Sequence, residues 1–131
     1  MPTNSLQMDI IRNILAVGAG SFIGGTARYL VSLAFKGIGK GLPWATLAVN
    51  LAGCFIIGVL WGVLSRNATE GNYWGLFLTV GFCGSFTTFS TFSKEILMML
   101  QSGQIWGFAA YIASSVIAGV ALVASGYYLV R

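Results

Sequence analysis

The sequence has 131 residues, of which 56% are hydrophobic and only 8% are charged, and its mean hydropathy is +0.83. Soluble domains carry about 25% charged residues, so this composition indicates a membrane protein. The formal net charge of +4 comes from seven basic and three acidic residues, which are too few for a nucleic-acid-binding surface.

Four apolar segments are each long enough to cross a bilayer as a helix, which takes about 20 residues. The predicted helices cover residues 11–35, 44–64, 73–100 and 105–130, and residues 1–131 form one four-helix transmembrane domain. The first segment could mimic a signal peptide, but its length, the arginine within it and the later spans favour a retained helix. Breaks at 36–43, 65–72 and 101–104 are short, so consecutive helices are expected to be antiparallel neighbours. Aromatic residues lie at the helix ends, as in an interfacial belt: Trp44, Tyr73, Trp74, Trp106, Tyr127 and Tyr128.

Small residues mark the expected packing faces. The pairs Gly20 with Gly24 and Gly58 with Gly62 have the spacing that lets two helices approach closely. They fit packing within one subunit or packing between subunits. The two cysteines lie in apolar segments without a CxxC spacing and are interpreted as small buried hydrophobic residues, not as a disulfide framework.

The basic residues divide evenly between the two sides of the membrane. One side carries Arg12, Arg66 and Arg131, and the other carries Lys36, Lys40 and Lys94. The positive-inside rule therefore gives almost no orientation. Either a partner sets the orientation, or the chain inserts both ways and pairs with its own inverted copy. An oligomer is also favoured because four helices cannot easily enclose a pathway alone.

The third apolar segment contains a polar stretch, residues 81–93, which combines hydroxyl residues, two glycines and four phenylalanines without a charge. Hydroxyl groups in hydrocarbon need hydrogen-bond partners. Gly81 and Gly84, followed by Thr87 and Thr88, predict a third helix that is broken in mid-membrane. A break frees backbone groups that must be satisfied, and freed carbonyls could bind a dehydrated monovalent cation. At a two-fold axis both copies would supply such carbonyls.

Several polar side chains within the predicted spans can all donate hydrogen bonds, and none of these is an anion: Thr46, Asn50, Tyr111, Ser115 and the hydroxyls of the third span. The carboxylates, Asp9, Glu70 and Glu95, do not fall in the middle of an apolar run, and there is no histidine. A metal-cation pathway would usually show carboxylate rings, and a proton-coupled exporter would need an ionisable group in mid-membrane. A lining that is rich in donors and free of carboxylates suits a small anion.

Several of these residues allow two interpretations. Asn50 could join helices or line a wet path. Arg28 could snorkel to the interface or attract an anion at a vestibule. Phe89 and Phe92 share one helix face and could pack in a core, or their positively polarised ring edges could replace part of an anion's hydration shell. Fluoride would fit such tight donors better than chloride.

Three motifs resemble the Fluc-type, or CrcB-like, fluoride channels over essentially the full chain: Gly-Gly-Thr-Ala-Arg-Tyr at 24–29, Thr46 with Val49, Asn50 and Gly53, and Gly-Ser-Phe-Thr-Thr-Phe-Ser-Thr-Phe at 84–92. The resemblance implies an inverted, dual-topology homodimer in the bacterial inner membrane. Each of its two pores would be lined by both subunits. The implied function is passive fluoride export, without enzyme activity or an organic cofactor.

The resemblance also assigns residues to the site. The implied fluoride pore consists of Asn50, Phe89, Phe92, Thr91, Thr46, Tyr111 and Ser115, with Arg28 at a vestibule. The next turn after Ser115 carries Gly119, so a shorter polar track is expected here. A structural sodium ion at the dimer axis would be held by the backbone carbonyls of Gly84 and Thr87.

Two rival functions explain less of the sequence. A four-helix multidrug exporter would need a carboxylate within the first helix, whereas Asp9 precedes that segment. A membrane assembly subunit that transports nothing would explain the small-residue faces but not the hydroxyl and phenylalanine stretch.

Overall fold

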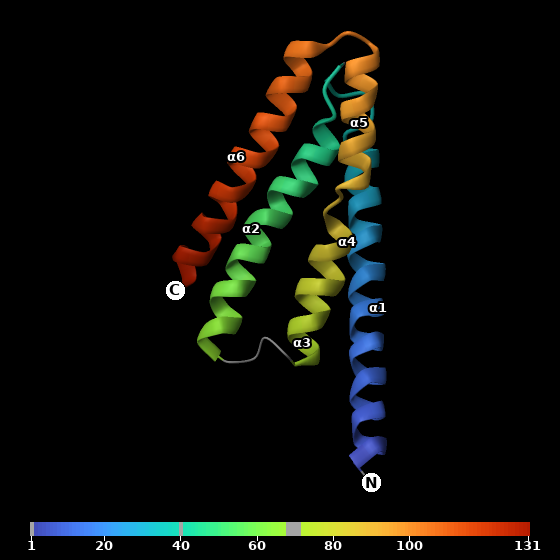
Figure 1. The fold of residues 1–131 in the computed structure, drawn as a ribbon, viewed down its shortest axis with the longest axis vertical. Helices are drawn as coiled ribbons and strands as arrows, with labels where there is room; N and C mark the ends of the chain where they lie inside the picture. Colours follow the sequence, from blue (N-terminus) through green and yellow to red (C-terminus); the bar gives the residue numbers. More distant parts are fainter. Residues whose placement is uncertain (1, 40, 68–71) are drawn as a thin grey trace.

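The computed structural model describes residues 2–39, 41–67 and 72–131, and this part of the chain contains four helical spans long and apolar enough to cross a membrane (Figure 1). The first span is α1 (Pro2–Ala34), the second α2 (Trp44–Asn67) and the fourth α6 (Ile105–Val130). The third consists of α3 (Tyr73–Leu76), the π-helical segment η1 (Phe77–Cys83), α4 (Gly84–Phe86) and α5 (Ser90–Gln101). Successive spans run in opposite directions, which confirms the prediction of an all-helical, multi-pass membrane protein.

Two helices extend further than predicted. α1 begins at Pro2 and not near residue 11, so its N-terminal part projects past the other helices (Figure 1). Proline is tolerated in a first turn, and the polar residues that follow include no helix breaker. Polarity was therefore a poor guide to where this helix begins. α2 continues to Asn67, and residues 68–71 of the predicted polar turn, which include Glu70, lie outside the described residues, as does Lys40.

Glycine sets the connection between α1 and α2. Gly37, Gly39 and Gly41 have φ values of 83°, 68° and 103°, a region that residues with a side chain rarely adopt. The predicted break at 36–43 is confirmed. At the start of the third span, the Asn72 Oδ1 atom accepts a hydrogen bond of 2.7 Å from the Gly75 amide and caps α3.

The helices pack as two close pairs, α2 with α6 and α1 with η1. A methyl group added at Gly20 would overlap the Phe77 carbonyl oxygen, and one at Gly58 would overlap the Val123 carbonyl oxygen. Both glycine pairs are therefore used for packing within the subunit, which decides between the two interpretations.

Gly20→Ala is expected to destabilise the protein by about 1–3 kcal/mol, because α1 must move away from η1 to admit the new methyl group. The matched control is Gly18→Ala, where an added Cβ meets nothing within 4 Å. It should be neutral or stabilising by up to about 1 kcal/mol, the usual helix preference for alanine. Thermal unfolding of both purified variants in one detergent measures the difference. Equal midpoints would contradict the close packing at Gly20.

The buried part of the subunit is small. Its buried apolar side chains are Val49, Leu64, Cys83, Phe86, Met99 and Tyr111, and Thr46 is buried with them. Large apolar side chains elsewhere are exposed, including Phe22 at 76% and Trp106 at 89%. Such a surface suits contact with lipid, and the thin core leaves a groove between the two helix pairs.

Candidate functional site

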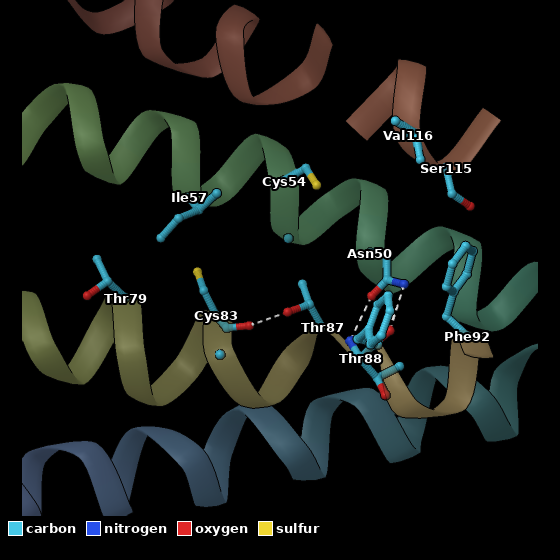
Figure 2. Close-up of a pocket in the computed structure, with 13 residues that line it drawn as sticks. Asn50, Cys54, Ile57, Thr79, Cys83, Thr87, Thr88, Phe92, Ser115 and Val116 are labelled. Carbon is cyan, nitrogen blue, oxygen red and sulfur yellow. Dashed lines mark hydrogen bonds between the residues drawn. The ribbon is translucent and has the colours of Figure 1, made fainter. Parts of the chain in front are cut away.

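The groove between the helix pairs has a volume of about 480 Å³ and is lined by α2, the third span and α6 (Figure 2). It brings together six of the residues predicted for the two ion sites: Asn50, Phe89, Phe92, Ser115, Gly84 and Thr87. The other predicted residues, Thr46, Thr91, Tyr111 and Arg28, do not line it. Seven residues that were not predicted for either ion site also line it, among them Thr88, Cys54 and Thr79.

The backbone of the third span is not helical at residues 87–89. α4 ends at Phe86, Thr87 is extended with a ψ of 162°, and α5 begins at Ser90. Asn50 spans the groove to this segment (Figure 2). Its Oδ1 atom accepts from the Thr88 amide at 2.8 Å, and its Nδ2 donates to the Thr88 carbonyl at 3.0 Å. One side-chain amide thus satisfies both backbone groups of a non-helical residue, which favours the interpretation that Asn50 joins helices.

This arrangement also diverts two backbone donors. In an unbroken helix the Gly84 carbonyl would accept from the Thr88 amide, and the Thr87 carbonyl from the Thr91 amide. Instead the Thr88 amide donates to Asn50, and the Thr91 amide donates to Thr88 Oγ1 at 3.3 Å. The carbonyls of Gly84 and Thr87 therefore lose their usual helical donors beside the groove. Carbonyl oxygens of this kind are suitable ligands for a monovalent cation.

Two further hydrogen bonds hold α4 and the non-helical segment that follows it. The Arg28 guanidinium reaches across from α1 and donates from Nε to the Ser85 carbonyl at 3.1 Å. The Thr87 hydroxyl donates to the Cys83 carbonyl at 2.9 Å (Figure 2). Arg28 is partly buried and has a backbone partner, so it contributes to the geometry of this segment whatever else it does.

A carboxylate lies between two of the predicted pore residues. Glu95 Oε1 accepts from the Thr46 hydroxyl at 2.7 Å, and Oε2 accepts from the Tyr111 hydroxyl at 2.7 Å. Glu95 belongs to the third span, so the prediction, which gave these donors no carboxylate neighbour, is wrong for Thr46 and Tyr111. The residues that line the groove include no carboxylate. The prediction judged Glu95 by its place near the end of an apolar run. Its spacing from Phe92, three residues earlier on the same helix face, was the signal that we missed.

The four phenylalanines of residues 81–93 lie in two different environments. Phe82 and Phe86 stack with ring centroids 5.4 Å apart, and Phe86 is buried, so these two rings pack in the core. The Phe92 ring meets the Tyr111 ring edge-on, with centroids 4.9 Å apart. Phe92 thereby connects the groove to Tyr111 and its hydrogen-bond partner Glu95. Phe89 lines the groove and is 79% exposed, so most of its ring does not pack within the subunit.

Ser115 presents a donor to the groove. Its Oγ atom is buried and has no hydrogen-bond partner among the described residues. An unpaired buried hydroxyl is costly unless something accepts from it. The residues that the structure describes include no group of three or more His, Cys, Asp or Glu side chains that could hold a metal ion. Together these features suit a small anion at Ser115 and a cation at the carbonyls.

Comparison with known proteins identifies the relationship. The model of the family described as "CrcB-like protein, Camphor Resistance (CrcB)" matches residues 15–127. The chain belongs to this family. The predicted resemblance to CrcB-like proteins is thereby confirmed, and it covers every residue that lines the groove.

Relatives of this CrcB-family chain match it over almost its full length. A protein of Chlorobium phaeobacteroides (strain BS1) is 42% identical over 118 residues, which cover 90% of this chain and 92% of the relative. One from Leptospira interrogans (serovar copenhageni, strain Fiocruz L1-130) is 39% identical over 95% of this chain and 98% of its own length. A third, from Chlorobaculum tepidum, is 42% identical over 93% and 97%. Each is named "Fluoride-specific ion channel FluC", the name of a channel and not of an enzyme.

Proposed function

We propose that the chain is a fluoride-selective channel through which cytoplasmic fluoride leaves passively across a bacterial inner membrane. The relatives named as fluoride channels support the ion. The observation that carries the proposal is the unpaired Ser115 hydroxyl in a groove that also holds Phe89 and Phe92. A hydroxyl donor beside positively polarised ring edges favours a small anion. The membrane potential would drive the exit, by about 2.3 kcal/mol per charge for each 100 mV.

The proposed working unit is an inverted homodimer of the single four-helix domain. The groove is open along one side, and the exposed Phe89 ring lies beside it, so a second copy could complete the wall. The even division of basic residues supports insertion in both orientations. Two copies related by a two-fold axis have two equivalent grooves, and hence two pores.

The remaining pore residues contribute in different ways in this proposal. Phe89, Phe92 and Ser115 face the ion in the groove, while Asn50 holds the non-helical segment in place; Thr91 precedes Phe92 and does not itself line the groove. Thr46 and Tyr111 already donate to Glu95, so a fluoride ion that reaches them must compete with a carboxylate for their hydrogen bonds. Passage at this point would therefore require Glu95 to release at least one hydroxyl. Arg28 hydrogen-bonds to the Ser85 carbonyl and, in addition, supplies a fixed positive charge that would attract the anion.

The cation proposed at the dimer axis is a structural sodium ion. The carbonyls of Gly84 and Thr87 support this proposal, because both have lost their usual helical donors and both residues line the groove. When bound, the ion would offset their partial negative charge and tie the broken third helices of both copies together. Replacing sodium by a heavier monovalent ion and locating it by anomalous scattering tests this assignment. Density away from these carbonyls would refute it.

Ion efflux from liposomes that hold the purified protein tests the function. Fluoride should leave rapidly and chloride negligibly, and fluoride loss should require a potassium ionophore to balance the charge. The ionophore matters because Glu95 is an ionisable group within a span, as a proton-coupled exporter would need. Fluoride loss without the ionophore would favour proton coupling, and no fluoride loss from folded protein would refute both.

Phe89→Ile is expected to lower fluoride flux at least tenfold while the protein still assembles as the wild type does. Isoleucine retains the apolar volume but lacks the polarised ring edge. The control is Phe22→Ile on α1, because Phe22 is 76% exposed, almost as much as Phe89, and does not line the groove. Efflux assays at equal protein density measure both. Equal fluoride flux in the two variants would contradict a role of the Phe89 ring in the pore and would leave it a packing residue.

A further inference from the structure

A second groove runs along the outer side of the subunit, where the N-terminal half of α1 passes α3 and the start of η1. Its volume is about 630 Å³, and its lining consists of Arg12, Leu15, Ala16, Tyr73, Trp74 and Phe77. α1 and α3 lie side by side here, near the N-terminal end of the molecule (Figure 1). One wall position is cationic, and the remaining positions are apolar or aromatic.

The position of this groove along the membrane normal follows from the length of α1. Ala34, the last residue of α1, lies 22 residues after Arg12, which corresponds to about 33 Å of helix. The hydrocarbon core is about 30 Å thick, so Arg12 lies at the headgroup level when Ala34 lies at the opposite interface. Tyr73 and Trp74 begin the third span at the same level, as interfacial aromatics do. Leu15 and Ala16 lie one turn deeper, among acyl chains.

Arg12 is the cation in this region whose guanidinium has no protein partner among the described residues. It is exposed, and Asp9, one turn earlier on α1, does not pair with it and does not line the groove. By contrast, the Arg66 guanidinium donates to the Val130 carbonyl at 2.8 Å, and Arg131 lies 5.3 Å from the Tyr127 ring centre. A planar guanidinium is well suited to bind a phosphate with two hydrogen bonds.

We propose that this groove binds one phospholipid with an anionic headgroup. Arg12 pairs with the phosphodiester, the Tyr73 hydroxyl and the Trp74 indole N–H donate at the headgroup level, and an acyl chain lies along Leu15, Ala16 and Phe77. A second copy of the chain is a poorer occupant, because an inverted copy presents its Lys36 and Lys94 end and a parallel copy presents Arg12, Arg66 and Arg131. The proposal does not depend on the transported ion.

Native mass spectrometry of the full-length protein tests the proposal. The protein is purified from vesicles with equal amounts of phosphatidylglycerol and phosphatidylcholine of identical acyl chains. The wild type should retain phosphatidylglycerol preferentially. Arg12→Gln should lower its retention about fivefold, the effect of one cation near an anionic bilayer surface. Arg12→Lys should retain most of the binding, and Ala16→Phe should lower it by filling the groove with the charge unchanged.

The control is Arg131→Gln, which removes one positive charge from the same side of the membrane and does not touch the groove. An equal loss in Arg131→Gln and Arg12→Gln would show that only net charge matters and would overturn the site. Equal retention of both lipids by the wild type would overturn the anionic headgroup. Unchanged retention in Arg12→Gln would overturn the role of Arg12, and Arg12→Gln is expected to fold because this side chain is exposed and unpaired in the described structure.

Discussion

Asn50→Leu should abolish fluoride flux and destabilise the subunit by about 2–6 kcal/mol, since it leaves two backbone groups of Thr88 without partners, at about 1–3 kcal/mol each. Both groups bond to the Asn50 side chain, at 2.8 and 3.0 Å. Thr88 is not helical, so no backbone ladder replaces these bonds, and hydrocarbon offers none. Liposome efflux and denaturant unfolding in detergent measure the two effects.

Two further variants separate the loss of the two Asn50–Thr88 hydrogen bonds from other consequences of the substitution. Asn13→Leu makes the same chemical change on α1, where no hydrogen bond of the Asn13 side chain is found within the described residues. It should be nearly neutral in both assays. Asn50→Asp retains the acceptor for the Thr88 amide but loses the donor to the Thr88 carbonyl, so its stability should lie between the wild type and Asn50→Leu. If Asn50→Leu and Asn13→Leu have the same free energy of unfolding, the two Asn50–Thr88 hydrogen bonds do not stabilise the subunit.

Much of the fold could be predicted because it depends on local properties of the sequence. Apolar length defines the spans, and the glycines at 37, 39 and 41 end α1 in a conformation that other residues avoid. The close approach at Gly20 and Gly58 follows from a spacing that can be read directly. The start of α1 could not be predicted in this way, because polar residues before a span are equally compatible with a loop or a helix.

The hydrogen bonds between helices in the candidate site are harder to predict, because the residues that they join lie far apart in the chain. Thr46 and Glu95 are 49 residues apart, and Asn50 and Thr88 are 38 apart. Helical spacing relates residues on one helix and does not reveal which side chain on another helix they meet. Thr46 and Tyr111 were identified as donors, yet the acceptor between them was excluded because Glu95 was judged by its position along the third segment. Local spacing placed Phe89 and Phe92 on one helix face, and the family resemblance added Ser115 and Asn50, which lie beside them in the groove.

Glu95→Leu is expected to destabilise the protein by about 2–6 kcal/mol, because it leaves the hydroxyls of Thr46 and Tyr111 unpaired at about 1–3 kcal/mol each. These residues are 6% and 2% exposed, so water cannot take the place of the carboxylate. The neighbouring variant Lys94→Leu is the control. Lys94 is exposed and should change stability by no more than about 0.5 kcal/mol.

A double-mutant cycle makes this expectation specific to the pair. Tyr111→Phe alone leaves one Glu95 oxygen without its donor, whereas the double variant Tyr111→Phe with Glu95→Leu leaves neither group of that hydrogen bond behind. The double variant should therefore be more stable than the sum of the single effects predicts, by about 1–2 kcal/mol. Additive effects in chemical unfolding would mean that Glu95 and Tyr111 do not share the hydrogen bond of 2.7 Å in the membrane. A coupled result would place a carboxylate at Thr46 and Tyr111, two of the donors proposed for the fluoride path, and in that proposal release of one hydroxyl by Glu95 would be a step in permeation.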